Sequence, residues 1–131
     1  MSDRPIPPPD PRGRLARSFG YAWRGLGALL RTQANARLHA AATVLVVAAG
    51  FALRIAPGEW CAILAAVGLV WLGEGLNTAI ETLTDLVSPG PHPLAGRAKD
   101  VAAGAVLCAA LAALVIGAVV FLPHLAELVA R

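Results

Sequence analysis

Charged residues are scarce in this chain of 131 residues, and three long stretches contain none of them. Only 15% of the residues are Asp, Glu, Lys or Arg, whereas 57% are hydrophobic. The uncharged stretches are residues 40–53, 60–73 and 101–122. The mean hydropathy of +0.66 is too high for an ordinary soluble protein. The composition therefore excludes a soluble globular domain and indicates a membrane protein.

Cysteine is also rare, and several familiar sequence motifs are missing. The two cysteines, Cys61 and Cys108, both lie in apolar stretches, where we expect small buried side chains rather than a disulfide. No apolar region follows the early arginine, which excludes a signal peptide. The chain has neither a G-x-x-x-x-G-K-[ST] loop nor a protein-kinase signature, so it is not a P-loop protein or a protein kinase.

The basic residues are distributed unevenly about the apolar stretches. Of eleven Lys and Arg residues, seven precede the first apolar stretch and two, Arg97 and Lys99, lie between the second and third; only Arg54 and Arg131 fall elsewhere. This bias places the N-terminus and the second loop in the cytoplasm and the C-terminus outside, with the chain crossing the plasma membrane several times. The positions of the charges also exclude nucleic acid as a partner.

The pattern along the chain predicts an all-α membrane protein. Residues 1–12, which hold five of the ten prolines, are expected to be a disordered tail. Residues 13–131 are expected to form one domain with a surface helix over 13–34 and membrane spans over about 38–56, 60–87 and 99–122. The surface helix is amphipathic and suits the membrane interface. Its apolar side is Leu15, Phe19, Trp23, Leu26 and Leu30, and its basic side is Arg14, Arg17, Arg24 and Arg31.

A polar face follows the uncharged part of the second span. At about 100° per residue, four polar side chains of EGLNTAIETLTD share one narrow face of a helix: Glu74, Asn77, Glu81 and Asp85. Glu74 is expected at the edge of the hydrocarbon and Asp85 beyond it. A carboxylate within the membrane is costly, which indicates a functional site. The alternative is that all four residues form a solvated helix end.

Two motifs in this region resemble a known family. EGLNTAIETLTD, followed after a short loop by HPLAGRAKDVAAGAV, is similar to the signature of the prokaryotic diacylglycerol kinase and undecaprenol kinase family, and the resemblance covers roughly residues 14–122. It implies a small integral-membrane enzyme that phosphorylates a lipid alcohol with MgATP. It also implies a homotrimer with shared sites.

The resemblance implies a role for each matching residue. Glu74 is the general base and contacts the lipid hydroxyl. Asn77 orients Glu74 or the γ-phosphate, and Glu81 holds Mg²⁺ and, through it, the nucleotide. Lys99 neutralises charge on the transferring phosphoryl group. The other residues that match nucleotide contacts are Arg14, Tyr21, His92 and Asp100.

Lys99 is also notable from its position alone. With the third span beginning near residue 99, Lys99 is expected at a helix N-terminus, where the dipole and free N–H groups favour phosphate. The alternative is that Lys99 is only a basic residue flanking the membrane.

The segment before the first span both supports the resemblance and departs from it. Asn35, Arg37 and His39 match the Asn-x-Arg-x-His element of the undecaprenol kinase branch, which favours undecaprenol over diacylglycerol as the lipid bound here. Two residues before that Asn the family has a metal-binding Glu, whereas this chain has Gln33. A neutral amide is a poorer ligand for Mg²⁺ than a carboxylate.

Three functions are therefore compared. The first is ATP-dependent phosphorylation of a lipid alcohol at the cytoplasmic face of the membrane. The second, motivated by Gln33, is a catalytically weakened homologue that acts as a membrane scaffold or regulator. The third is an ion or proton transporter that uses the intramembrane acids. A transporter does not explain Lys99 and Asp100 at the cytoplasmic end of a span, so the lipid kinase is preferred.

Overall fold

The computed structural model describes residues 11–130, with side chains described from residue 13, and every regular element in that range is an α-helix. The helices are α1 (Pro11–Thr32), α2 (Ala34–Leu53), α3 (Pro57–Val87) and α4 (Pro93–Val129). The predicted all-α fold is confirmed. The prediction of a tail through residue 12 is wrong at its end, because α1 begins at Pro11, where the fixed φ of proline suits the first helical position. Residues 1–10 of that tail lie outside the described residues.

The chain divides into two compact units, Met1–Thr32 and Gln33–Arg131. The first contains α1, which leaves Leu15, Phe19 and Trp23 largely exposed to its surroundings. On the same helix the guanidinium carbon of Arg24 lies 4.8 Å from the ring centre of Tyr21. An exposed apolar stripe with arginines on the other side is the pattern of a helix that lies in the membrane interface. The placement of α1 in that interface stays a prediction.

The second unit contains three helices that are long and apolar enough to cross a bilayer, α2, α3 and α4. Only 6% of the apolar window of α4 is buried, and large side chains such as Leu114 and Val119 are exposed along it. Exposed apolar surface of this extent is unfavourable in water and favourable in lipid. The predicted three-span membrane protein is confirmed, whereas the homotrimer stays a prediction.

The turn between α2 and α3 depends on one close approach. Arg54 ends α2 in the left-handed region (φ 54°), and the N–H of Ile55 returns to the carbonyl of Gly50 at 3.2 Å. The indole of Trp60 lies over Gly50, where an added Cβ would be 2.7 Å from its nearest ring carbon. Trp60 also packs against Phe51, with ring centres 4.9 Å apart. The absence of a side chain at Gly50 therefore lets α2 and α3 meet at this end.

The Gly50→Ala variant is expected to be less stable by about 1–3 kcal/mol, because Trp60 must move to make room for the methyl group. Thermal unfolding of the purified protein in detergent measures this as a lower melting temperature. Gly68→Ala is the matched control, since an added Cβ at Gly68 meets nothing within 4 Å. Equal melting temperatures for the two variants would show that the packing of Trp60 does not require the absence of a side chain at residue 50.

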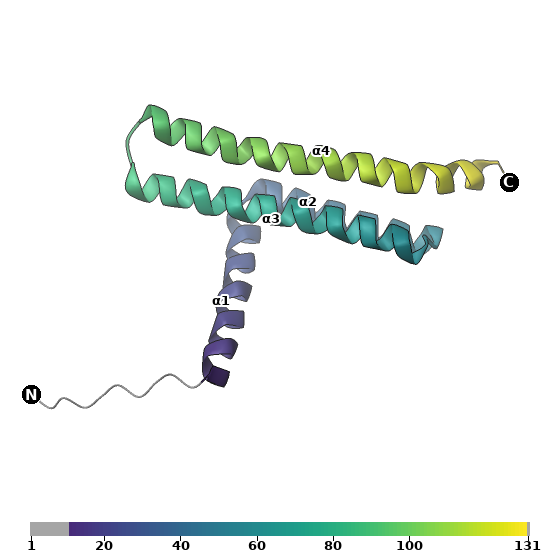
Figure 1. Cartoon of the computed structure of the whole chain (residues 1–131), viewed down its shortest axis with the longest axis horizontal. Helices are drawn as coiled ribbons and strands as arrows, with labels where there is room; N and C mark the ends of the chain where they lie inside the picture. Colours follow the sequence, from purple (N-terminus) through teal and green to yellow (C-terminus); the bar gives the residue numbers. More distant parts are fainter. Residues whose placement is uncertain (1–10, 131) are drawn as a thin grey trace, which may run out of the picture. The chain divides into compact units, whose positions relative to one another are not determined.

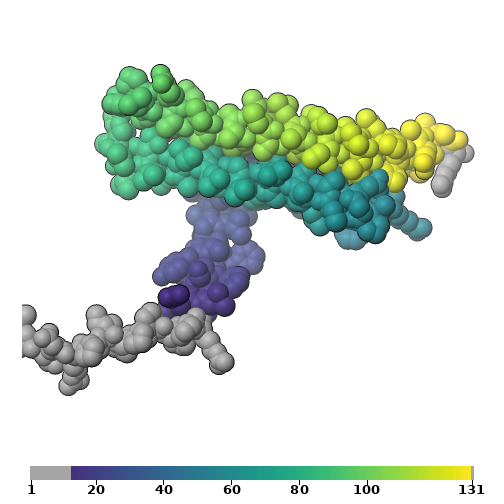
Figure 2. Space-filling view, viewed as in Figure 1, coloured from purple at the N-terminus to yellow at the C-terminus, as the bar shows by residue number. Residues whose placement is uncertain are grey.

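The hairpin of α3 and α4 is the largest packed surface in the second unit. The two helices run side by side in opposite directions (Figure 1), and their atoms meet along the hairpin in the space-filling view of Figure 2. Midway, an added Cβ on Gly73 would lie 3.6 Å from the Cα of Val106, so the backbones approach closely there. Small residues on a helix surface permit this kind of packing in membranes.

Polar contacts join both ends of the hairpin. At one end the Lys99 ammonium lies 2.5 Å from the Asp85 carboxylate. At the other end Nε2 of His124 lies 3.1 Å from Glu59, whose carboxylate also accepts the backbone N–H of Ala56 at 2.6 Å. These contacts join α3 to α4 near both ends of the hairpin.

Candidate functional site

Along the predicted polar face of α3, the side chains become less buried from Glu74 to Asp85. Glu74 is 1% exposed and Asn77 is 8% exposed. Glu81 is partly buried and Asp85 is exposed. A solvated helix end would leave all four side chains exposed, so the structure favours the interpretation of this face as a site.

Hydrogen bonding along this face is incomplete. The Asn77 amide donates from Nδ2 to Oε1 of Glu81 at 3.1 Å. Three other buried oxygens have no hydrogen-bond partner in the described chain: Glu74 Oε2, Asn77 Oδ1 and Thr78 Oγ1. Buried polar atoms in proteins are almost always paired, so unpaired ones that occur together call for an explanation. Carboxylate and amide oxygens of this kind can take a proton or a hydrogen bond from a bound molecule.

Lys99 does not stand at a helix N-terminus as predicted. The helix begins at Pro93, six residues earlier, because proline is well tolerated at the first helical position. His92 caps it, with Nδ1 accepting the N–H of Leu94 at 3.2 Å. Lys99 lies on the second turn and pairs with Asp85, and both side chains remain partly or largely exposed. Its charge is therefore available at this end through its own ammonium group and not through free backbone N–H groups.

The loop between α3 and α4 borders a cavity of about 600 Å³. Its lining combines the ion pair of Asp85 and Lys99 with Ser88, His92 and Gly96. Asp100 follows Lys99 and is exposed. The size of the cavity and the presence of a partly exposed ammonium suit part of a polar ligand such as a phosphate chain.

Gln33 lies near the level of Asn77 and Glu81 on α3. The indole Nε1 of Trp71 on α3 donates to Oγ1 of Thr43 on α2 at 3.1 Å, and Trp60 on α3 lies against Gly50 on α2. The two helices are antiparallel, so counting from these contacts back to Gln33 leads to a position on α3 between Asn77 and Glu81. Gln33 precedes α2, and its carbonyl accepts the N–H of Arg37.

A metal at this level would have few protein ligands. Between residues 13 and 130 no group of three or more His, Cys, Asp or Glu side chains is placed to hold a metal ion. Glu81 offers one carboxylate group, and Gln33 offers one amide oxygen near the same level. These donors fit Mg²⁺ in the mode in which one or two carboxylates and the substrate phosphates bind it, and do not fit a metal site built by the protein alone.

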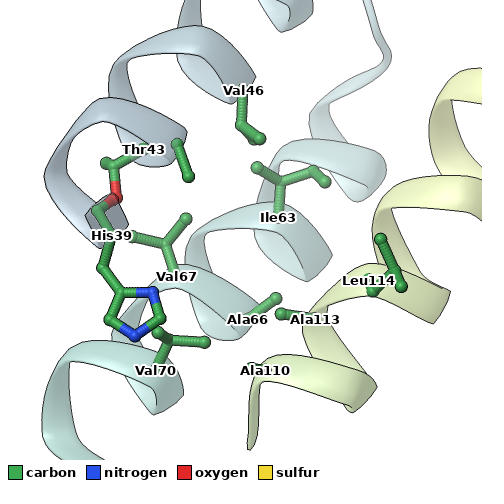
Figure 3. Close-up of a pocket in the computed structure, with 11 residues that line it drawn as sticks. His39, Thr43, Val46, Ile63, Ala66, Val67, Val70, Ala110, Ala113 and Leu114 are labelled. Atoms are coloured by element: carbon green, nitrogen blue, oxygen red, sulfur yellow. The ribbon is translucent and has the colours of Figure 1, made fainter. Parts of the chain in front are cut away.

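An apolar pocket of about 230 Å³ lies between α2, α3 and α4 (Figure 3). Val70, one turn of α3 before Glu74, lines it together with Ile63 and residues of α4 such as Ala110 and Leu114. His39 on α2 lines it as well, and its backbone carbonyl accepts the hydroxyl of Thr43 at 2.7 Å. The pocket thus begins close to the level of Glu74 and continues among apolar side chains.

Comparison with known proteins agrees with these features. The family model of the prokaryotic diacylglycerol kinases matches residues 20–121. This chain belongs to the prokaryotic diacylglycerol kinase family. It is 43% identical to the undecaprenol kinase of Bacillus subtilis (strain 168) over 112 residues, 86% of this chain and 91% of that protein. It is 42% identical to the diacylglycerol kinase of Synechocystis over 112 residues, 85% of this chain and 64% of that protein. It is 32% identical to the diacylglycerol kinase of Escherichia coli K12 over 111 residues, 85% of this chain and 91% of that protein.

Family membership confirms the resemblance found in the sequence, and the structure brings only some of the predicted residues together. Glu74, Asn77 and Glu81 share one face, with Asn77 bonded to Glu81 and no bond between Asn77 and Glu74 in the described chain. Asn35 and Arg37 are exposed on the first turn of α2. Arg14 and Tyr21 are exposed on α1, in the other unit. Their contact with the nucleotide stays a prediction.

Two features of this family member were missed in the sequence. One is the apolar pocket, because it is built from three helices whose apolar residues each look like ordinary lipid-facing positions. The other is Thr78, which lies inside the EGLNTAIETLTD motif. In the sequence it looks like an ordinary threonine on the surface of a helix. The spacing of Thr78 four residues after Glu74 was the available signal, since residues i and i+4 share a helix face.

Proposed function

We propose that this chain phosphorylates a membrane lipid alcohol with ATP at the cytoplasmic face of the membrane. The observation that carries the proposal is Glu74, a carboxylate buried in an apolar hairpin with one oxygen unpaired, one helical turn beyond a residue that lines an apolar pocket, Val70. A buried acid in such a place suits a general base. The relatives named undecaprenol kinase and diacylglycerol kinase support the same reaction class.

The acceptor lipid supplies a hydroxyl group and an apolar tail. We assign the tail to the pocket beside Val70 and the hydroxyl to the unpaired oxygen of Glu74. In the reaction the O–H bond of the lipid breaks and its proton passes to Glu74. The lipid oxygen forms a bond to the γ-phosphorus, and the bond from that phosphorus to the β,γ-bridging oxygen breaks, so ADP leaves with the electron pair.

The nucleotide is assigned to the wetter end of the same face. Lys99 borders the cavity at the loop between α3 and α4 and offers its charge to the phosphoryl oxygens. Asn77 holds the carboxylate of Glu81 in place through its amide. Glu81 and Gln33 would hold Mg²⁺, which, when bound, neutralises charge on the phosphates. The other nucleotide contacts are proposed from the family pattern: Arg14, Tyr21, His92 and Asp100.

The lipid is proposed to be undecaprenol, with diacylglycerol as the second candidate. Asn35, Arg37 and His39 match the undecaprenol branch, and His39 also lines the pocket. Transfer of labelled phosphate from ATP, in detergent with Mg²⁺, to each lipid offered separately tests the proposal. Product on undecaprenol and little on diacylglycerol is expected, and product on neither lipid would overturn the proposed function.

A second candidate function follows from Gln33. With an amide where the family has a metal-binding Glu, a weakened homologue that serves as a membrane scaffold or regulator is the alternative. The Gln33→Glu variant separates the two. If the chain is an active kinase, the variant is expected to raise phosphate transfer by no more than about tenfold and to lower the Mg²⁺ concentration required, because a carboxylate binds this cation more tightly.

The assay for this variant is a titration of phosphate transfer against Mg²⁺ concentration for both proteins. Gln33→Asn serves as the matched control, since it keeps an amide at the same position. Activity that is absent in the natural chain and present only in Gln33→Glu would favour the scaffold or regulator.

A further inference from the structure

Thr78 differs from every other threonine of the chain. All five threonines lie in the described helices, and the hydroxyl of a helical threonine commonly donates to the carbonyl four residues earlier. Four of them do so: Thr32, Thr43, Thr82 and Thr84. The hydroxyl of Thr78 makes no such bond to Glu74, and its oxygen is buried with no hydrogen-bond partner in the described chain.

The unpaired hydroxyl lies beside two other unpaired oxygens. At about 100° per residue, Asn77 and Thr78 flank Glu74 on α3, one about 60° to one side and the other about 40° to the other side. Side chains three and four residues apart on a helix have Cβ atoms about 5–6 Å from each other. The unpaired atoms Glu74 Oε2, Asn77 Oδ1 and Thr78 Oγ1 therefore belong to neighbouring side chains on one side of this helix, with Glu74 between the other two.

The chemistry of these atoms limits the kind of group that satisfies them. An ionised Glu74 oxygen only accepts hydrogen bonds, whereas the Thr78 hydroxyl both donates and accepts. The two side chains are close enough on the helix to pair with each other, but they do not. A group that donates to Glu74 and accepts from Thr78 pairs both at once. A hydroxyl group does this, whereas an ester carbonyl or an ether, which has no proton, leaves Glu74 unpaired.

We propose that Thr78 binds the oxygen of the acceptor hydroxyl, donating from Oγ1 to that oxygen while Glu74 receives its proton. The inference rests on the proposed function for the identity of the acceptor, a lipid alcohol whose tail lies in the pocket beside Val70. Hydrogen bonds to both Thr78 and Glu74 orient the hydroxyl, so that one lone pair of its oxygen points toward the phosphorus and its proton points toward Glu74. Thr78 thus selects a hydroxyl over a lipid without one.

Equilibrium binding of lipid, without ATP, tests the inference apart from catalysis. The ligands are a short-chain form of the lipid alcohol and the same lipid with hydrogen in place of its hydroxyl. The natural chain is expected to bind the alcohol about 10²-fold more tightly than the deoxy lipid, because the alcohol bonds both Glu74 and Thr78. Thr78→Val, which keeps the shape and loses the hydroxyl, is expected to lose about tenfold of that preference and to bind the deoxy lipid unchanged. Thr78→Ser is expected to retain the preference.

Thr82→Val is the matched control, because Thr82 lies one turn further along α3 and its hydroxyl donates to the backbone carbonyl of Thr78 at the exposed surface. It is expected to keep the preference for the alcohol. A merely structural role of Thr78 would weaken both lipids equally in Thr78→Val and leave the preference for the alcohol unchanged. That result overturns the inference, as does loss of the preference in Thr78→Ser.

The same variants in the transfer assay separate this inference from the proposed function. For Thr78→Val the KM for the lipid is expected to rise about tenfold, with the KM for ATP unchanged. If the natural chain binds the alcohol through Thr78 and transfers no phosphate, the proposed function fails and the binding inference stands. If it transfers phosphate and Thr78→Val retains the natural lipid KM and alcohol preference, the inference fails and the function stands.

Discussion

The Glu74→Gln variant is expected to transfer phosphate to lipid with a kcat about 10²–10⁴-fold lower than that of the natural chain. Glutamine has nearly the same shape but cannot take the proton of the lipid hydroxyl. Glu74 is 1% exposed, so water has little access to replace the lost base. Initial rates at saturating ATP and lipid measure the change directly.

The variant should fold as well as the natural chain. Burying a neutral amide costs less free energy than burying a carboxylate that lacks a partner, so its melting temperature in detergent is expected to be equal or higher. The KM for ATP is expected to change little, since we assign the nucleotide to the other end of the polar face. A kcat within fivefold of the natural value would mean that another group accepts the proton.

The Lys99→Met variant is expected to lose about 10²–10³-fold in kcat, the usual effect of removing one group that stabilises charge in the transition state. Methionine keeps a long apolar side chain on the second turn of α4 and removes only the ammonium. The measurement is again phosphate transfer at saturating substrates, with melting temperature as the test of folding.

Asp85→Asn is the control for the ion pair that Lys99 makes. An exposed pair contributes at most about 1 kcal/mol to stability, so losing it is expected to lower activity less than about fivefold. The ammonium of Lys99 remains present in this variant. Equal losses in Lys99→Met and Asp85→Asn would show that Lys99 acts only by joining α3 to α4, and would remove it from the proposed phosphate site.

The polar face of α3 was predictable because it depends on one helix alone. A period of 3.6 residues fixes which side chains share a face, and no proline interrupts residues 60–87. Glu74, Asn77 and Glu81 therefore lie together in the structure as expected. The bond from Asn77 to Glu81 was not predicted, because the choice between Glu74 and Glu81 as partner depends on side-chain rotamers.

Hydropathy alone predicted the wrong first residue for the helix that carries Lys99. The third span was predicted from the uncharged run that begins at Val101, and the helix was assumed to begin with it. Pro93 instead starts α4 eight residues before that run, with His92 as its cap. Hydropathy reports where a helix enters the lipid, whereas caps and proline positions determine where the helix begins.

The amino-acid sequence by itself determined the class of this protein, its three apolar helices and the line of acids along one of them. These features follow from local composition and helical period, which require no knowledge of how the helices meet. Only the tertiary structure showed that Glu74 is buried and that an apolar pocket begins beside Val70. The physical reason is that burial and cavity shape arise from contacts between helices, and those contacts join residues far apart in the sequence, such as Trp71 with Thr43.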